Sequence, residues 1–477
     1  MILRVISFIT VGSLILPVAF ANPIQRSGPA PLPWESTPGE ALQLSEVLAS
    51  VEKRMPLTLA AKAQLETAQG REVSARGVFD LRLQSQFGGL SESYNQRTWD
   101  AQLTQQFWGT PLEVYAGWRR GQGEFRPYEG KSLTGTEGEY RTGFKLPLLR
   151  DFLTDPGRTR KDVAEAGSRA AEGDFRFRTL DLKRIASERY WDWVGSSLQL
   201  NAVIRLYRLA EERMKQVERR VHAGSAAKIE EVEAERMITQ RLSQLIEAER
   251  NYQRAALELS LYLRDENGNS VVPGRPLSEV LPISTPPQAP KDLDVWIKDA
   301  QAQRGDLRSL SEQQEGLERE ASLASVQRLP RLDVQFEYAA DRGVPKAGET
   351  EVRGSVGLSF PIQNREARGN FLAQQARLDQ LKQNRRFLQD QVAQEVQTTF
   401  SALLAAHQKA KAMAKDQELS ERLANAERKR FQDGLSSLLI VNLREQAAND
   451  SVLKALEARI DYEKLRIRLS VVRGSDL

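Results

Sequence analysis

The residues that most often carry enzyme chemistry are scarce in this sequence. Its 477 residues include two histidines, His222 and His407, and no cysteine. No acid–base constellation, phosphate-binding loop or zinc-ligand spacing occurs around them. The pair Gly121 and Gly123 lacks the third glycine and the following helix of a nucleotide-binding loop. We therefore expect no catalytic residue, no cofactor and no metal site.

A charged stretch centred on a glycine occurs twice. Residues 217–236 are VERRVHAGSAAKIEEVEAER, and residues 427–446 are ERKRFQDGLSSLLIVNLREQ. Each has a basic run, a glycine at the eighth position and an acidic residue at the nineteenth. Glycine accepts the positive φ that ends a helix, and basic residues suit the negative end of a helix. Each stretch therefore predicts a chain reversal, at Gly224 and at Gly434.

Long helical segments flank both glycines. Residues 157–222 and 365–432 contain no proline, and apolar residues such as Leu378, Leu381 and Leu388 recur at steps of three, four or seven. Helical patterns also follow each glycine. This spacing is typical of coiled-coil packing, so we expect two antiparallel helical hairpins. A helix of about 65 residues is on the order of 100 Å long.

Alternating segments predict strands with one apolar face. Residues 331–338 and 352–360 alternate strictly, and two similar segments lie near 81–87 and 140–146. Their length is close to the 9–11 residues of a bilayer-spanning strand. Alternation alone also fits a soluble sandwich, but the long helices favour the membrane interpretation.

The first half contains an added hairpin. Residues 97–127 hold two further alternating segments around the turn Gly109-Thr110-Pro111. This hairpin could lengthen the outer end of the strands, fold against them or add strands to them.

The sequence divides into two parts of similar order. Residues 271–290 hold six prolines and predict an extended connector between a first repeat, 41–270, and a second, 291–477. Arg54 aligns with Arg304 and Leu57 with Leu307 at a constant offset. This match indicates an internal two-fold duplication.

The N-terminus predicts export from the cytoplasm. Residues 1–21 combine a basic start, an apolar run and the site Ala19-Phe20-Ala21, which is typical of a cleaved signal peptide rather than a membrane anchor. A proline-rich lead-in, 22–40, follows. Without cysteine we expect no lipoprotein. The 68 basic and 64 acidic residues nearly balance, which favours solvated helices over nucleic-acid binding.

These features together resemble the TolC-type outer-membrane efflux protein family over the whole mature chain. The family's tip pattern, an arginine followed four residues later by glycine, stands here as Arg220 to Gly224 and Arg430 to Gly434. The resemblance implies an α+β membrane protein. A homotrimer would share one β-barrel in the outer membrane of a Gram-negative bacterium, in contact with its lipid. Each protomer would give about four strands to this barrel, with the extra hairpin attached at its outer end. A long α-helical coiled-coil tunnel would continue the barrel through the periplasm.

The resemblance also implies a function and a site. The trimer would be the passive exit duct of a tripartite efflux or secretion system, fed by an inner-membrane transporter and a periplasmic adaptor protein. The adaptor would dock on the tips. The docking residues would be Arg220, Gly224, Ser225, Arg430, Gly434 and Leu435. Candidates for a charged aperture near the tips are Lys228, Glu230, Asp433 and Arg444.

The two tips depart unequally from the family pattern. Phe431 supplies the aromatic residue of the second tip, whereas Val221 and His222 stand at that place in the first. The alternative function is a periplasmic coiled-coil structural or adaptor protein without a membrane span, against which the apolar strands argue. Long charged helices disfavour a porin. Drug, metal and protein export all stay open.

Overall fold

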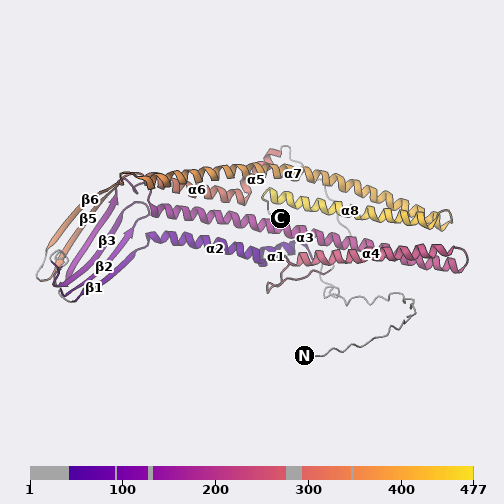
Figure 1. Ribbon diagram of the computed structural model, residues 1–477, viewed down its shortest axis with the longest axis horizontal. Coiled ribbons are helices and arrows are strands. Elements are labelled where there is room, and N and C mark those ends of the chain that lie inside the picture. Colours follow the sequence, from indigo (N-terminus) through magenta and orange to yellow (C-terminus); the bar gives the residue numbers. More distant parts are fainter. Residues whose placement is uncertain (1–41, 92–93, 127–132, 275–292, 345–348, 476–477) are drawn as a thin grey trace, which may run out of the picture.

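The computed structural model describes residues 42–91, 94–126, 133–274, 293–344 and 349–475. The expected signal peptide, the lead-in 22–40 and most of the connector 271–290 lie outside these ranges. Figure 1 shows an elongated molecule with a β-sheet at one end and two helical hairpin tips at the other. Within the described ranges, no helix is both long and apolar enough to cross a membrane.

The chain forms two successive sets of helices and strands. The first set is α1 (Leu44–Arg54), α2 (Pro56–Arg76), the 3₁₀ turn η1 (Gly77–Phe79), β1 (Arg82–Leu90), β2 (Gln96–Gln106), β3 (Glu113–Gly123), β4 (Gly138–Pro147), α3 (Pro156–His222) and α4 (Lys228–Ser260). The second set is α5 (Leu293–Gln303), α6 (Gly305–Val326), β5 (Arg331–Arg342), β6 (Thr350–Ser359), α7 (Arg365–Gln432) and α8 (Leu438–Val472).

The short helices break within one residue of the same place in the two sets. Met55 separates α1 from α2 with φ −67° and ψ 124°, and Arg304 separates α5 from α6 with φ −64° and ψ 127°. Both residues are extended, so each helix restarts in a new direction. The internal duplication itself stays a prediction.

All six strands lie in one antiparallel sheet in the order β1-β2-β3-β4-β5-β6. The expectation of four strands with the extra hairpin outside them is therefore wrong for this sheet. The hairpin supplies β2 and β3, which pair with β1 on one side and β4 on the other. Its alternation is in phase with that of its neighbours, so the backbone pairing continues through it without a break.

The register gives the sheet one apolar and one polar face. On the apolar face Phe87 lies opposite Trp99 and Phe144 opposite Phe336, with ring centroids 5.3 and 5.7 Å apart. The same alternation continues to β6, where Val356 faces Val334. Aromatic cross-strand pairs of this kind stabilise a sheet by about 0.2–1 kcal/mol each.

Ion pairs and hydrogen bonds tie the strands together on the polar face. The Tyr115 hydroxyl donates to Glu337 at 2.9 Å, and Arg353 reaches the same carboxylate at 3.4 Å. Arg141 donates to Asp100 at 2.5 Å, across the intervening strand β3. One group of bonds thus joins β3, β5 and β6, and another joins β2 and β4.

Helix α3 is the central element of the helical part. Asp155 caps its first turn by accepting hydrogen bonds from the backbone N–H groups of Gly157 and Arg158 at 2.8 and 2.9 Å. In Figure 1, α2 and α6 flank its first half, and α4 and α8 flank its second half. The main core lies where α3, α4 and α8 meet α1, around the fully buried Trp193 and Leu259.

Two glycines bring α3 and α6 into backbone contact. A Cβ at Gly173 would lie 2.6 Å from the carbonyl oxygen of Gly305, and a Cβ at Gly305 would lie 2.3 Å from that of Gly173. Both distances are too short for any side chain. The crossing of these helices therefore depends on glycine at both positions.

We predict that Gly173→Leu lowers the free energy of unfolding by about 1–3 kcal/mol, because backbone atoms must move to admit the side chain. Gly167→Ala, in the same helix, is the matched control. Nothing lies within 4 Å of its added Cβ, and alanine favours the helix by about 1 kcal/mol. Thermal unfolding followed by circular dichroism checks both, and an unchanged midpoint for Gly173→Leu would contradict the contact.

Candidate functional site: the hairpin tips

Both hairpins reverse through the same backbone motif. Gly224 has φ +69° and Gly434 has φ +75°, in the left-handed region that favours glycine. The N–H of Ser225 donates to the carbonyl of Arg220 at 2.9 Å, and that of Leu435 donates to the carbonyl of Arg430 at 2.8 Å. These bonds satisfy carbonyls at the end of α3 and α7, as in a Schellman motif.

The side chains of the two turns differ. In the second tip, the Ser436 hydroxyl donates to the buried Glu427 carboxylate at 2.5 Å and ties the turn to α7. The corresponding residues of the first tip are Val217 and Ala226, which have no polar side chain. The second turn therefore has an extra restraint, consistent with the unequal tips expected from the sequence.

Phe431 joins the two hairpins near their ends. It packs with Val217 of α3 and Leu438 of α8 in a small apolar cluster. The guanidinium groups of Arg213 and Arg220 lie 6.0 and 5.5 Å from its ring centroid. A cation over an aromatic ring contributes about 0.5–2 kcal/mol, more when water is excluded.

A buried ion pair between α3 and α8 stabilises the same contact. Arg213 donates to both carboxylate oxygens of Glu445, at 2.9 and 2.8 Å, and also to Asn442 at 3.2 Å. Arg428 of α7 adds a third bond to Glu445, at 3.0 Å. Less than a tenth of the Arg213 and Glu445 side chains is exposed.

A second buried arginine lies beside this network. Arg241 of α4 lines a cavity of about 20 Å³ together with Arg213 and Glu445. Burial lowers the pKa of the Arg241 guanidinium, and the carboxylates of Asp450 and Glu445 partly offset this effect. All four long helices thus contribute side chains to the walls of this cavity or to the ion pair beside it.

The structure places the expected docking residues at the exposed end of the molecule. Gly224, Ser225, Gly434 and Leu435 are all exposed. The two arginines differ: Arg220 lies 3.9 Å from Glu230 of α4, whereas Arg430 lies 3.6 Å from Glu427 of its own helix.

The four aperture candidates are not assembled within one chain. Lys228, Asp433 and Arg444 are exposed, and in the described part of a single chain none of them forms an ion pair. Glu230 alone is paired, with Arg220. The sequence did not lead us to expect a role for Arg213 or Arg428. Arg213 lies on the apolar seam of α3 and Arg428 lies near the glycine of the second tip, and these positions were the only indication of such a role.

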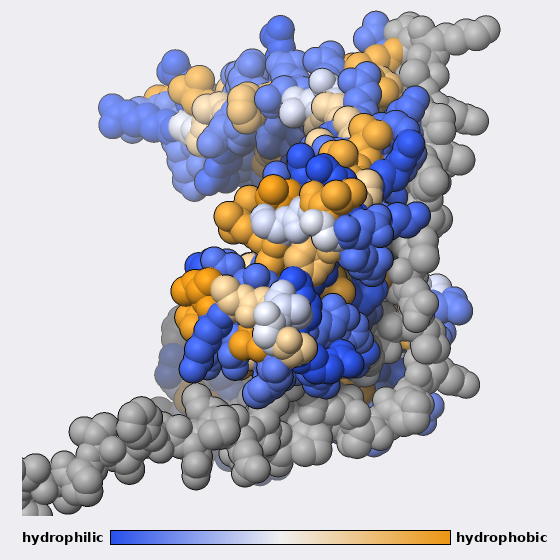
Figure 2. Space-filling model, turned by 90° about the vertical axis from the view of Figure 1, so that its right-hand side faces the viewer, coloured by the Kyte–Doolittle hydropathy of each residue, from blue (hydrophilic) through white to orange (hydrophobic). Residues whose placement is uncertain are grey.

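The tips also expose apolar side chains. Figure 2 views the molecule from the end that carries the tips and shows hydrophobic residues gathered there. The exposed apolar residues of the two tips are Ile229, Val232, Leu435, Leu439, Ile440 and Leu443. We call this set the tip patch. Clustered exposed apolar residues are typical of a surface that binds another protein.

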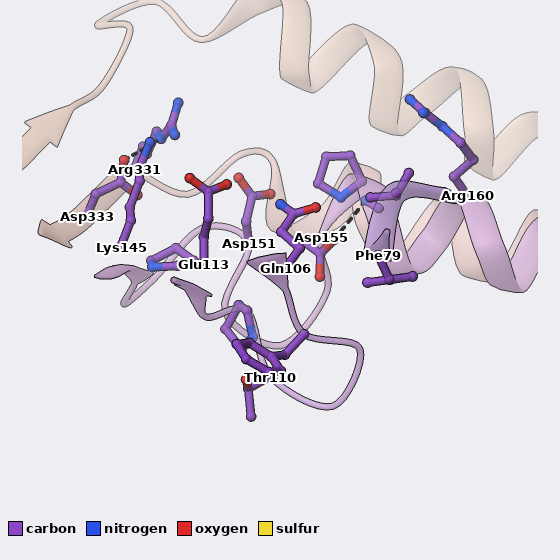
Figure 3. A pocket seen from close by; sticks show the side chains of 16 residues that line it. Phe79, Gln106, Thr110, Glu113, Lys145, Asp151, Asp155, Arg160, Arg331 and Asp333 are labelled. Carbon is purple, nitrogen blue, oxygen red and sulfur yellow. Dashed lines mark hydrogen bonds and ion pairs between the residues drawn. The ribbon is translucent and has the colours of Figure 1, made fainter. Parts of the chain in front are cut away.

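A second cavity, of about 280 Å³, lies where the sheet meets the helices. Figure 3 shows that Glu113, Asp151 and Asp155 lie along it, with the Arg331–Asp333 ion pair at one side. Acidic and basic residues line it together, and no group of three or more potential metal ligands occurs in the described ranges.

Asp151 is the strained residue of this junction. Its φ of 70° lies in the left-handed region, and burial raises the pKa of its carboxyl, although Arg150 and Arg331 act in the opposite direction. The residue turns the chain from β4 towards α3. The change from strand to helix accounts for this arrangement.

Comparison with known proteins identifies the fold. No family model and no curated protein matches the sequence. The outer-membrane channel MtrE of Neisseria gonorrhoeae is similar, with a TM-score of 0.67 and 14% identity over 91% of this chain and 89% of that chain. The outer-membrane protein VceC of Vibrio cholerae gives 0.65 and 14% over 91% and 96%. The Campylobacter jejuni channel CmeC gives 0.62 and 13% over 93% and 90%. The protein therefore has the fold of bacterial outer-membrane channels.

We predict that Glu445→Leu weakens the packing of the two hairpins by about 3–5 kcal/mol, because Arg213 remains buried without its carboxylate. The double variant Arg213→Met/Glu445→Leu should recover most of this loss. Amide hydrogen exchange of residues 206–221 measures the opening free energy.

The matched control for this prediction is Glu235→Leu. Glu235 has the same place in the first stretch but is exposed, so its replacement should change the opening free energy by less than about 0.5 kcal/mol. Equal losses for the single and double variants would show that the buried pair does not couple the hairpins.

Proposed function

We propose that the protein is a TolC-type outer-membrane channel that acts as the passive exit duct of a tripartite efflux or secretion system. Three copies would form the channel. The sheet would lie in the outer membrane and the helices would extend through the periplasm. An inner-membrane transporter and a periplasmic adaptor would deliver the cargo to the tips.

The continuous apolar face of the sheet carries this proposal. The six strands have 9 to 12 residues each, which is the length that spans a bilayer when tilted. Exposed apolar side chains extend along this face, among them Leu83, Phe87, Val352, Val356 and Leu358. In water such a face would drive aggregation, whereas in lipid it needs no cover.

A periplasmic adaptor without a membrane span fits this sheet poorly, because its strands would need a second layer over the apolar face. In the described residues the helices pack end-on to the sheet and leave that face uncovered. The likeness to outer-membrane channels over about nine-tenths of the chain supports the channel function further.

The tip patch would be the docking surface for the adaptor. Its apolar side chains surround the exposed turns at Gly224-Ser225 and Gly434-Leu435, with Arg220 and Arg430 beside them. An apolar surface of this kind fits the apolar tip of another helical hairpin. We propose the second tip as the stronger contact, because the Glu427–Ser436 bond holds its turn in place.

We predict that Leu435→Glu weakens adaptor binding at least about tenfold, since burying a leucine contributes about 1.5–3 kcal/mol. A photo-crosslinking residue at Ser225 would report the adaptor in living cells. Leu435→Met is the control, because methionine keeps a similar apolar volume at the same position. The proposed function fails if Leu435→Glu leaves both the crosslink and export at wild-type levels.

The aperture would form where the tips of three copies meet. Asp433 and Arg444 are exposed and unpaired within the described part of one chain, so they are available to charges on a neighbouring copy. Lys228 and the Arg220–Glu230 pair would line the same end. Such exposed pairs contribute about 0–1 kcal/mol each, so several must act together to close a channel.

Conductance in planar bilayers tests the aperture. We expect Asp433→Lys alone to raise the open fraction less than about fivefold, and Asp433→Lys with Arg444→Glu to raise it further if they pair with different groups. Lys215→Glu, an exposed change farther from the turn, should have no effect. Unchanged closure in the double variant would remove both residues from the aperture.

A further inference from the structure

The two outer strands of the sheet have free edges. Strand β1 pairs only with β2, and β6 pairs only with β5, among the described residues. Every residue of β6 is exposed, as are most of β1. Each unsatisfied backbone group in hydrocarbon costs several kcal/mol, so free edges of this length need partners.

The free edges of the sheet continue into the edges of the helical part. In Figure 1, β6 and α7 lie along one side of the molecule, and β1, α2 and α4 lie along the other. Both sides carry exposed apolar side chains: Leu372 and Phe387 on α7, and Leu57, Leu59 and Val73 on α2. A partner that covers one edge of the sheet would also cover the helices beside it.

A second copy of this chain fits these edges. Successive strands are antiparallel and six in number, so β6 runs opposite to β1. Placing β1 of one copy beside β6 of the next therefore continues the antiparallel order. We propose that these edges pair between copies and that three copies close a ring of eighteen strands, six from each. The closure of one shared barrel by three copies rests on the proposed function; the strand count and the register of the edges are the further claims.

The register within the sheet predicts how the edges meet. Successive backbone partners lead from Arg82 through Thr104, Tyr115, Gly143 and Glu337 to Arg353. The residue of β6 that lies at the same height in the sheet as Arg82 is therefore Arg353. The end of β6 next to the helices is Ser359, six residues further along the strand. In a ring with rotational symmetry, Arg82 at the start of β1 in the next copy would lie beside Ser359.

Pairing Arg82 with Ser359 shifts the register by six residues per copy, or eighteen around the ring of three. A shift equal to the number of strands corresponds to a strand tilt of about 36°, within the usual 35–45°. The shift is even, so polar residues meet polar ones. Shifting the register by one residue would place the apolar face of β1 against the polar face of β6.

This register gives favourable pairs on both faces. Leu83 would lie opposite Leu358, and Phe87 opposite Gly354, where the ring has room. On the polar face Gln86 would lie opposite Ser355. With strands about 4.8 Å apart and this tilt, the backbone ring would be about 34 Å across, compared with about 23 Å for twelve strands.

Paired cysteines in the full-length, cysteine-free protein test the register. Gln86→Cys is combined in turn with Arg353→Cys, Ser355→Cys, Gly357→Cys and Ser359→Cys, all on the polar face. Partners in an antiparallel pair have Cα atoms about 4.5–5.5 Å apart, within disulfide reach. We expect a covalent trimer with Ser355→Cys, and at least tenfold less with Ser359→Cys, about 13 Å away.

A second pair tests the strand count. Gln84 and Gln102 are partners in the β1–β2 ladder, so Gln84→Cys/Gln102→Cys should form a disulfide within one chain and leave its mass unchanged. Absence of this disulfide would place the extra hairpin outside the sheet and overturn the eighteen-strand ring. A crosslinking maximum at a residue other than 355 would overturn the register.

Export and oligomer size, measured on the same variants under reducing conditions, separate this inference from the proposed function. If no Gln86 pair crosslinks while trimers and export persist, the edges do not pair as inferred, and the channel function stands. If the cysteine-free parent protein itself forms no trimers and supports no export, both this inference and the proposed function are overturned. A covalent trimer reversed by reductant, with export intact, is the expected result.

Discussion

A sheet with one apolar face must still satisfy the backbone hydrogen-bonding groups of its strands, and the rest of the structure depends on this constraint. Six strands of spanning length place their apolar residues on one side and satisfy one another's backbone groups, but two edges remain open. A bilayer alone does not suit such a sheet, because lipid tolerates the apolar face but not the open edges. Water alone does not suit it either, because water tolerates the edges but not the apolar face. The closure by further copies that we propose would resolve both, and the helices that continue from the strands would then form a ring as well.

The structure of the opposite end of the molecule depends on how the two helical hairpins pack against each other. Phe431 and the buried Arg213–Glu445 pair join them within one chain, and Arg428 adds a bond from α7. Removing one member of a buried pair costs far more than the pair contributes, so the network fixes the relative position of the hairpins more than it adds stability. The residue matching Glu445 in the first stretch, Glu235, is exposed, and the two tips therefore present different surfaces.

Local patterns in the sequence predicted the elements well and their partners less well. Helices α3 and α7 begin and end within a residue of the expected bounds, because heptad spacing and the glycines at 224 and 434 are local signals. The alternation of β2 and β3 was also visible, but their pairing between β1 and β4 depends on neighbours far along the chain. Arg213 and Glu445 lie 232 residues apart, and a charged residue on a helix is usually solvent-exposed, so nothing local marked the pair. The aperture charges stay a prediction, because Lys228, Asp433 and Arg444 form no ion pair in the described part of one chain.

Cysteine labelling along β6 tests the central claim, that the apolar face of the sheet lies in lipid. Single cysteines at residues 351–358 would be exposed to a water-soluble maleimide in intact outer membranes. The account predicts alternation: labelling at the polar positions 351, 353, 355 and 357, and protection at 352, 354, 356 and 358, where Val352, Val356 and Leu358 face outward. Uniform labelling of all eight positions would show that the sheet lies in water, and would contradict the account.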